Sequence, residues 1–288
     1  MKKLSFLLSI LLTALFISAQ DVELVTISDQ VETQDTLKEQ KSRLYGPFTI
    51  NAQGDKVYFS QGDLQYQAST GTWRFADHQW DFVGDNTSGN VYIDDVKCNN
   101  ALVSNTYDGW IDLFGWGTGQ NPTYIGCSYN DLPFYNDFHD WGDNKISNGA
   151  DRTWRTLSSD EWYYLLMRSR NNNKVFKVSY VNANIDGISG IVLLPDTWNN
   201  EIYKLVNNTN IELTISEWYM NFESHNAVFL PVAYERECNI IYKPKYSGTD
   251  GTLYWTCDQR DAQNGKTLTG GMLTKPFGLP VRLVTNAY

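Results

Sequence analysis

The sequence predicts an α+β fold with strands at both ends of the folded region, two short helices between them and long loops. Three observations predict it. The folded region begins with alternating apolar and polar residues, two later stretches begin with helix-capping residues, and the final stretch again has β-strand character. A chain of 288 residues is also long enough to bury a substantial core.

The first 19 residues are typical of a secretory signal peptide. Two lysines precede an apolar run from Leu4 to Ile17, and small residues then lead to Ala19. This run is shorter than the roughly 20 apolar residues that a membrane-spanning helix needs, so we favour a signal peptide over a membrane anchor. We expect cleavage near Ala19, export to the periplasm, cell surface or exterior, and no membrane span in the mature protein.

The next segment, residues 20–43, contains no Trp, Phe or Tyr. It is polar and charged, which predicts a lead-in or linker. We therefore expect one folded domain over residues 44–288.

The opening of this domain is predicted to be β. The stretch Phe48–Gln67 holds two alternating runs with Gly-Asp turns, and Thr72–Asp85 repeats the alternation with aromatic residues at strand positions. Gly, Asn and Asp then punctuate Gly84–Gly149 every few residues. This composition predicts a long loop region with little regular structure.

Two helices are predicted from capping boxes, in which a hydroxyl side chain and a glutamate three residues later satisfy free backbone amides at a helix start. Ser158 and Glu161 form one such pair, and Thr214 and Glu217 form the other. A tryptophan follows each glutamate, as expected for the first residue of a buried helix face.

The first helix is expected to stop at Asn171–Asn173 and the second at His225–Asn226. Apolar runs within Gly187–Trp198 and Ala227–Pro231 predict buried strands. The chain after Gly251 is predicted to be β again.

Four cysteines, Cys98, Cys127, Cys238 and Cys257, fit a disulfide-permitting compartment. We expect Cys98 to pair with Cys127 and Cys238 with Cys257, because nearest-neighbour pairs close short loops. The alternative is free, buried thiols. A zinc site is disfavoured because no two cysteines have a C-x-x-C spacing.

The charge balance excludes one class of partner. The chain has 23 Lys and Arg against 33 Asp and Glu, a net charge of −10. Polyanion binding depends on basic side chains, so a nucleic-acid partner is not expected.

Aromatic residues make up 14% of the chain, and many lie in the long loop region. Such rings can stack on a ligand or can anchor loops by burial, and both interpretations stay open. The candidate ligand-binding residues are Trp110, Trp116, Tyr124, Tyr129, Tyr135 and Trp141.

The same region is rich in hard oxygen donors. Asp137, Asp140 and Asp143 are candidate calcium ligands, since carboxylates in a flexible loop suit that ion. The alternative is a solvated acidic loop. No cofactor besides calcium is indicated.

Three motifs occur in order along the second half of the chain: WRTLSSDEW at Trp154–Trp162, GTLYWTC at Gly251–Cys257 and GLPVRLV at Gly278–Val284. On these motifs the chain resembles the C-type-lectin-like fold, in the branch shared by sulfatase-modifying-factor proteins and the Fibrobacter major paralogous domain. The stretch 59–85 is also similar to exported proteins of gut Bacteroidales.

The resemblance implies a twisted antiparallel sheet that brings the two ends of the domain together, with two short helices, long loops and an insertion at about 175–234. It also implies that the helix start near Ser158 lies close to the strand ending near Val284. No catalytic residue carries over. The Glu-Pro-Asn or Gln-Pro-Asp and Trp-Asn-Asp tripeptides that hold calcium and sugar in the lectins do not occur.

These observations favour an exported, non-catalytic binding or surface-structural protein that recognises a glycan or another protein through its aromatic loops. The alternative is a secreted enzyme, either a glycan-active hydrolase or a modifying enzyme. For that alternative His139 and Asp140 are the candidate base and orienting acid.

Overall fold

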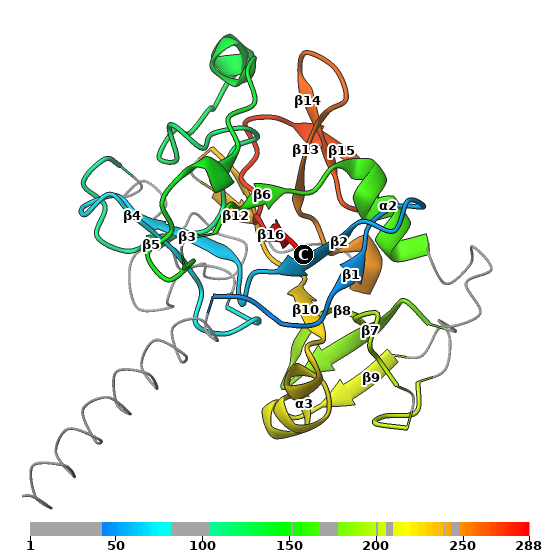
Figure 1. Cartoon of the computed structure of the whole chain (residues 1–288). Helices are drawn as coiled ribbons and strands as arrows, with labels where there is room; N and C mark the ends of the chain where they lie inside the picture. The colour runs from blue at the N-terminus through cyan, green and yellow to red at the C-terminus, as the bar shows by residue number, and fades with distance from the viewer. Residues whose placement is uncertain are drawn as a thin grey trace, which may run out of the picture. The chain divides into compact units, whose positions relative to one another are not determined.

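The structure is a computed structural model (Figure 1). It describes residues 42–81, 104–150, 152–167, 178–199, 201–205, 210–238, 240–242 and 248–287. The predicted signal peptide and nearly all of the predicted lead-in, together with Cys98 and the side chain of Tyr129, lie outside the described part.

The fold is mixed α+β, as predicted, with mostly antiparallel strands and few short helices. One four-stranded sheet joins both ends of the domain, in the order β1-β2-β16-β6, and it contains β1 (Phe48–Thr49), β2 (Lys56–Phe59), β6 (Arg155–Thr156) and β16 (Leu283–Asn286). In this sheet Val284 pairs with Phe59 on one side and with Arg155 on the other. The expected proximity of the helix start and the last strand is confirmed.

A second four-stranded sheet lies within the region expected as an insertion. Its order is β10-β8-β7-β9, and it contains β7 (Tyr180–Ile185), β8 (Ile188–Leu193), β9 (Asn210–Leu213) and β10 (Val228–Pro231). Helix α3 (Ile215–Asn221) follows β9 directly (Figure 1). Both predicted apolar strands are present in it: β10 is an edge strand, and β8 pairs with it as the next strand.

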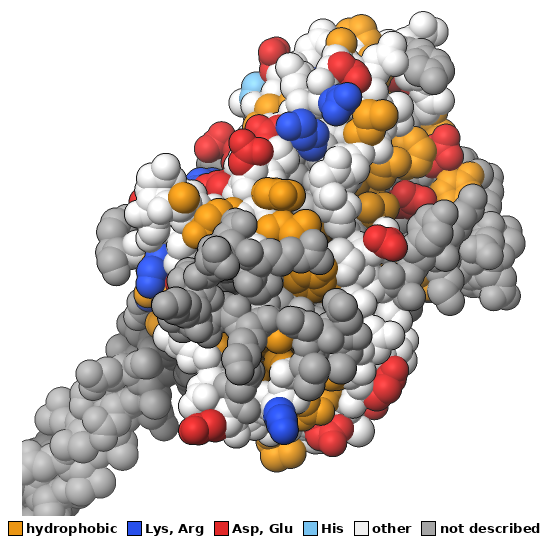
Figure 2. All heavy atoms as spheres, turned by 90° about the vertical axis from the view of Figure 1, so that its right-hand side faces the viewer, with side chains coloured by type: hydrophobic (Ala, Val, Ile, Leu, Met, Phe, Trp, Pro, Cys, Tyr) orange, Lys and Arg blue, Asp and Glu red, His pale blue; other side chains and the backbone are white. Residues whose placement is uncertain are grey.

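The surface shown in Figure 2 carries small groups of hydrophobic side chains between polar and charged ones. Lys and Arg side chains on this face are scattered and form no continuous basic patch. Among the described residues, no helix has both the length and the apolar character needed to cross a membrane.

At β8 and β10 the second sheet is buried on both faces, because the side chains of these two strands alternate between two cores. From β8, Ile191 and Leu193 join the core that contains helix α2, whereas Val192 joins the core that contains Trp218 of α3. This is the period of two expected for a strand. The second sheet therefore separates the two cores.

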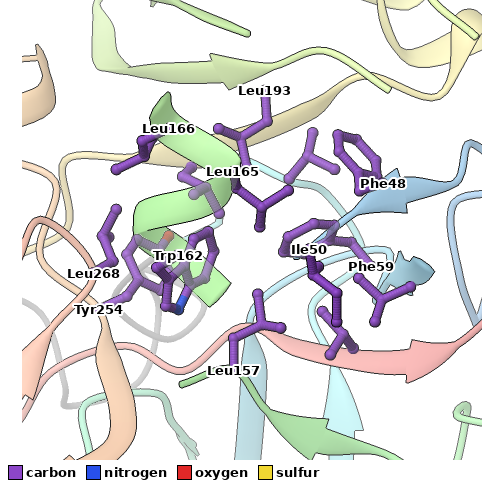
Figure 3. Packing of buried hydrophobic residues seen from close by; sticks show 14 of the residues in the cluster. Phe48, Ile50, Phe59, Leu157, Trp162, Leu165, Leu166, Leu193, Tyr254 and Leu268 are labelled. Atoms are coloured by element: carbon purple, nitrogen blue, oxygen red, sulfur yellow. The ribbon is translucent and has the colours of Figure 1, made fainter. Parts of the chain in front are cut away.

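Helix α2 (Ser159–Met167) supplies the apolar stripe predicted from its sequence. Trp162, Leu165 and Leu166 are buried and belong to the same core as Phe48 of β1 and Phe59 of β2 (Figure 3). The Trp162 ring lies 5.6 Å from the ring of Phe59. Burial of Trp162 between α2 and β2 anchors the helix to the sheet formed by β1, β2, β16 and β6.

Both predicted capping boxes are formed. The Glu161 backbone amide donates to Ser158 Oγ at 3.2 Å and the Ser158 amide donates to the Glu161 carboxylate at 2.7 Å. Thr214 and Glu217 make the same reciprocal pair at α3. Helix α3 ends at Asn221, earlier than predicted. A 3-10 turn, η4 (Glu223–His225), carries the chain on to the predicted stop.

The remaining elements are short: β3 (Leu64–Gln67), β4 (Thr72–Phe75), β5 (Trp110–Ile111), η2 (Tyr129–Tyr135), η3 (Trp141–Asp143), β11 (Glu235–Glu237), β12 (Ile240–Tyr242), η5 (Gly248–Asp250), β13 (Trp255–Gln259), β14 (Asn264–Thr267) and β15 (Met272–Thr274). Between residues 104 and 149, the described chain holds only β5 and two 3-10 helices. The prediction of sparse regular structure is confirmed there.

The cysteine pairing differs from the expectation. Cys127 is bonded to Cys238, 111 positions away, and Cys257 is a free thiol. The predicted Cys238–Cys257 and Cys98–Cys127 pairs are therefore wrong. The prediction of nearest-neighbour cysteine pairs failed because the fold brings β11 against residues 104–149, here called the aromatic loop. Arg236, two residues before Cys238, donates to the Leu113 carbonyl at 2.8 Å.

Candidate functional site

Three of the six candidate aromatic rings are buried anchors. Trp116 is 2% exposed, and Tyr135 and Trp141 are fully buried. Trp116 Nε1 donates to the Thr256 carbonyl at 3.0 Å, and Tyr135 Oη accepts from the Gly126 amide at 2.9 Å. The prediction that these three rings contact a ligand is wrong, because each is used to attach the loop to the body of the domain.

Trp110 and Tyr124 are half-buried. The Arg74 guanidinium lies 3.7 Å from the centroid of the Trp110 ring. A cation at this distance is attracted to the ring face, so one face of Trp110 is already covered by the protein. Tyr124 is therefore the one of these two rings that remains a candidate for ligand contact. The side chain of Tyr129 lies outside the described part.

Tyr124 borders a groove of about 320 Å³ in the aromatic loop. The groove is lined by Gly117, Thr118, Asn121, Tyr124, Pro133, Phe134, Asp137 and His139. The Phe134 ring is 69% exposed and lies 4.9 Å from the Tyr124 ring. An exposed phenylalanine beside a second ring, in a concave site with polar neighbours, is the arrangement expected of a binding site.

The Tyr124 side chain is fixed by contacts with Asp131 and Tyr135. Its hydroxyl donates to the Asp131 carboxylate at 3.3 Å, and its ring lies 5.4 Å from the buried Tyr135 ring. The backbone amides of Cys127 and Ser128 donate to the same Asp131 carboxylate and hold its pKa below the usual range. Asp131 is thus an anion at neutral pH, fixed behind the aromatic side of the groove.

The polar side of the groove is fixed by backbone pairing. The His139 amide donates to the Gly117 carbonyl at 3.1 Å, and the Gly119 amide donates back to the His139 carbonyl at 3.1 Å. A Cβ on Gly119 would lie 2.6 Å from the His139 and Asp140 carbonyl oxygens, so only glycine allows this approach. The loop segment at Gly117–Gly119 and the segment at His139 are therefore held side by side by backbone hydrogen bonds, although neither forms a regular strand.

Three side chains of the groove are free for a ligand. Within the described part of the chain, those of Asn121, Asp137 and His139 make no hydrogen bond or ion pair. Asn121 and Asp137 are exposed and His139 is half-buried. They offer a carboxylate, an amide and an imidazole in one concave site.

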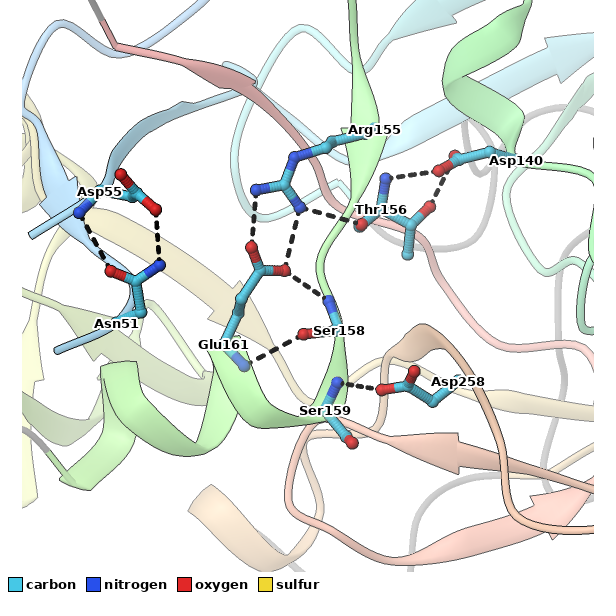
Figure 4. A network of polar contacts seen from close by, with 9 residues as sticks. All are labelled: Asn51, Asp55, Asp140, Arg155, Thr156, Ser158, Ser159, Glu161 and Asp258. Atoms are coloured by element: carbon cyan, nitrogen blue, oxygen red, sulfur yellow. Dashed lines mark hydrogen bonds and ion pairs between the residues drawn. The ribbon is translucent and has the colours of Figure 1, made fainter. Parts of the chain in front are cut away.

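The predicted calcium ligands are not gathered. The Asp140 carboxylate accepts from the Gly142 amide at 2.9 Å. It also accepts from the Thr156 amide and hydroxyl at 2.9 and 2.8 Å (Figure 4). It ties the loop to β6. Nowhere in the described ranges do three or more His, Cys, Asp or Glu side chains form a group that could hold a metal ion. The calcium prediction for Asp137, Asp140 and Asp143 gains no geometric support.

The same contacts bear on the enzyme alternative. Because the Asp140 carboxylate is taken by Thr156 and Gly142, it is not the orienting partner of the His139 imidazole. The neighbouring network is structural as well. Glu161 accepts two hydrogen bonds from Arg155, at 2.9 and 2.7 Å, in addition to its cap (Figure 4).

The free thiol of Cys257 lies beside this network. Burial, followed by the nearby carboxylates of Asp258, Asp140 and Glu161, raises its pKa to about 12. A thiol with this pKa stays protonated at neutral pH, and the thiol is a far weaker nucleophile than the thiolate. Cys257 is therefore not an activated nucleophile.

A second pocket, of about 180 Å³, lies beside the Cys127–Cys238 disulfide. It is smaller than the groove, and its lining includes Leu132, Pro276 and Phe277. The Ser128 hydroxyl in this lining already donates to Asp131 and accepts from the Asn130 amide. Fewer free polar groups converge here than in the groove.

Sequence reasoning placed its ligand candidates in the loop region that contains the groove, but it missed Phe134, Asn121 and Thr118 as groove residues. Phe134 and Tyr135 are adjacent aromatic residues, yet one is 69% exposed and the other is fully buried. Pro133 lies inside η2, and both rings follow it in the same 3-10 helix, so the local sequence carries no signal that separates the exposed ring from the buried one.

Comparison of the chain with family models, curated proteins and solved structures found no match in any of the three.

Proposed function

We propose that this protein is a non-catalytic binding protein that recognises a glycan through the groove between residues 117 and 139. The observation that carries the proposal is the Phe134 ring, exposed beside Tyr124 in a concave site that also holds the free polar side chains of Asn121, Asp137 and His139. Protein binding is the alternative partner class, and the experiment below separates the two.

The groove has the two chemistries that a sugar requires. The rings of Tyr124 and Phe134 offer apolar area for the C–H face of a pyranose. Asn121, Asp137 and His139 offer donors and acceptors for its hydroxyl groups. A few polar groups in a mostly apolar concave site are what fix the orientation of a small ligand.

Binding without turnover is favoured because the candidate catalytic groups are occupied. Asp140 holds β6, Glu161 holds the start of α2, and the Cys257 thiol is protonated. The secreted-enzyme alternative keeps one supporting observation, which is that Asp137 and His139 line the same groove. Release of product from a bound glycan would favour that alternative.

The proposal extends to location and family. A disulfide between Cys127 and Cys238 is typical of an oxidising compartment, which supports the proposed signal peptide and export. The capped helix after β6 and the pairing of β6 with β16 support a C-type-lectin-like fold. On this view the second sheet is an insertion into that fold.

A glycan array tests the function directly. Phe134→Ala should abolish the binding seen for the unchanged protein, because it removes the exposed ring and touches no core. Tyr163→Ala is the matched control, since Tyr163 is 62% exposed on α2 and lies outside the groove. No glycan bound by the unchanged protein, or equal binding by both variants, would contradict the proposal. A protein captured in a Phe134-dependent manner, with no glycan bound, would move it to the protein-binding class.

A further inference from the structure

Resting on the proposed function, we propose that the groove selects an uncharged sugar residue over an acidic one and holds it without calcium. The juxtaposition behind this proposal is that of the Asp137 carboxylate and the ring pair Tyr124 and Phe134, which line the same groove.

The charges around the groove disfavour an anionic ligand. None of the described residues that line it is Lys or Arg, and Asp137 contributes a negative charge. Asp131, behind Tyr124, is a second anion. A carboxylate or sulfate on a sugar would meet like charges, and such a juxtaposition is costly at close range.

Lys275 is a basic side chain whose charge interacts with Asp137, but it does not line the groove. Lys275 is fully buried, its Nζ donates to Gln259 Oε1 at 3.0 Å, and it lies 4.4 Å from the centroid of the Trp116 ring. Its ammonium is therefore engaged beneath the loop and is not presented to an acidic ligand. The chain as a whole has a net charge of −10, which adds to the same preference.

The free polar groups match the hydroxyl groups of a neutral sugar. Asp137 can only accept, so it pairs with hydroxyl donors, and a hydrogen bond from a hydroxyl to a carboxylate is among the stronger kinds. The Asn121 amide both donates and accepts. A group of hydroxyls supplies both partners, whereas a sugar carboxylate supplies acceptors alone.

Calcium is not required by this arrangement. Among the described residues, Asp137 is the one carboxylate that lines the groove, and Asp140 is engaged with Thr156 and Gly142. A calcium ion takes six to eight oxygen ligands, commonly with several carboxylates among them. The sugar is therefore held by direct hydrogen bonds and by the two rings. A groove of about 320 Å³ lies at the small end of ligand sites, which points to the end of a glycan and not to a long stretch of it.

The test is to measure affinity by isothermal titration calorimetry with two short oligosaccharides of the same backbone. One is neutral and the other carries a uronic acid, and each is titrated with and without EDTA. We expect the neutral sugar to bind at least about tenfold more tightly, a difference of about 1.4 kcal/mol. We expect EDTA to leave its affinity unchanged. Asp137→Asn should reduce this preference at least about threefold, because it removes the charge and keeps the shape. Asp143→Asn, an exposed acid of the same loop outside the groove lining, should not change the preference.

Each contrary result has its own meaning. Tighter binding of the acidic sugar, or loss of neutral-sugar binding with EDTA, would overturn this inference and leave the glycan-binding function standing. A preference for neutral sugar that Asp137→Asn leaves intact would also overturn it. Failure of every neutral and acidic glycan on the array to bind would instead overturn the proposed function.

Discussion

At the scale of single residues, the most demanding feature is a buried ion pair. Asp63 and Arg282 are both fully buried, with Nη1 and Oδ1 3.1 Å apart. Tyr254 Oη donates to the other Asp63 oxygen at 2.8 Å, and Gln79 Oε1 accepts from Arg282 at 3.0 Å. These contacts link the start of the domain to the residues that directly precede β13 and β16. A buried charge is tolerated only with such partners.

Burial raises the pKa of Asp63 to about 6, with Arg282 as the main opposing influence. The folded protein therefore binds this proton more readily than the unfolded chain does. The contribution to stability is complete below about pH 4 and is lost as the pH rises through about 6. We expect the ¹³C resonance of the Asp63 carboxyl to titrate with a midpoint near 6. A midpoint below 4 would mean that attraction to Arg282 outweighs burial.

Cys257 provides a second residue-scale prediction. Since burial and neighbouring carboxylates raise its pKa to about 12, its thiol should resist iodoacetamide at pH 8 in the folded protein. After denaturation it should react fully, as measured by mass spectrometry of the Cys257 peptide. Rapid labelling of that peptide in the folded state would show an exposed, ionisable thiol and would reopen the possibility of a nucleophile.

At the scale of elements, the helices illustrate what a sequence can specify. Both capping boxes were predictable because their partners, such as Ser158 and Glu161, are three residues apart. The Cys127–Cys238 bond was not predictable, because the contact depends on how β11 meets the aromatic loop. The same limit applies to the groove. The Gly, Asn and Asp content predicted the loop region, but only the tertiary fold decides that the Phe134 ring is exposed while the Tyr135 ring is buried.

The caps lead to a quantitative prediction. Ser158→Ala and Thr214→Ala should each lower the free energy of unfolding by about 1 kcal/mol, because each leaves a helix-start amide without its partner. Denaturation in guanidinium chloride measures this. Thr269→Ala, an exposed threonine outside any helix, is the control and should change stability by less than about 0.5 kcal/mol. An equal effect in the control and in the cap variants would contradict the capping interpretation.

At the scale of the whole molecule, the disulfide holds the aromatic loop to the remainder of the domain across 111 positions. Replacing both Cys127 and Cys238 by serine should cost about 2–5 kcal/mol, because the unfolded chain is no longer constrained. Peptide mapping without reductant should recover these two residues joined. Cys257→Ser is the control, since it removes a thiol and no bond. A recovered Cys238–Cys257 bridge would contradict the pairing described above.

The central claim is that the groove between residues 117 and 139 is the binding surface, and amide chemical shifts test it most directly. Titration with a neutral oligosaccharide that the protein binds should shift the amides from Gly117 to His139, with the largest changes near Phe134. The amides of α2, which is occupied with packing, should stay in place. Shifts confined to a different surface, with the groove amides unmoved at saturation, would contradict the account.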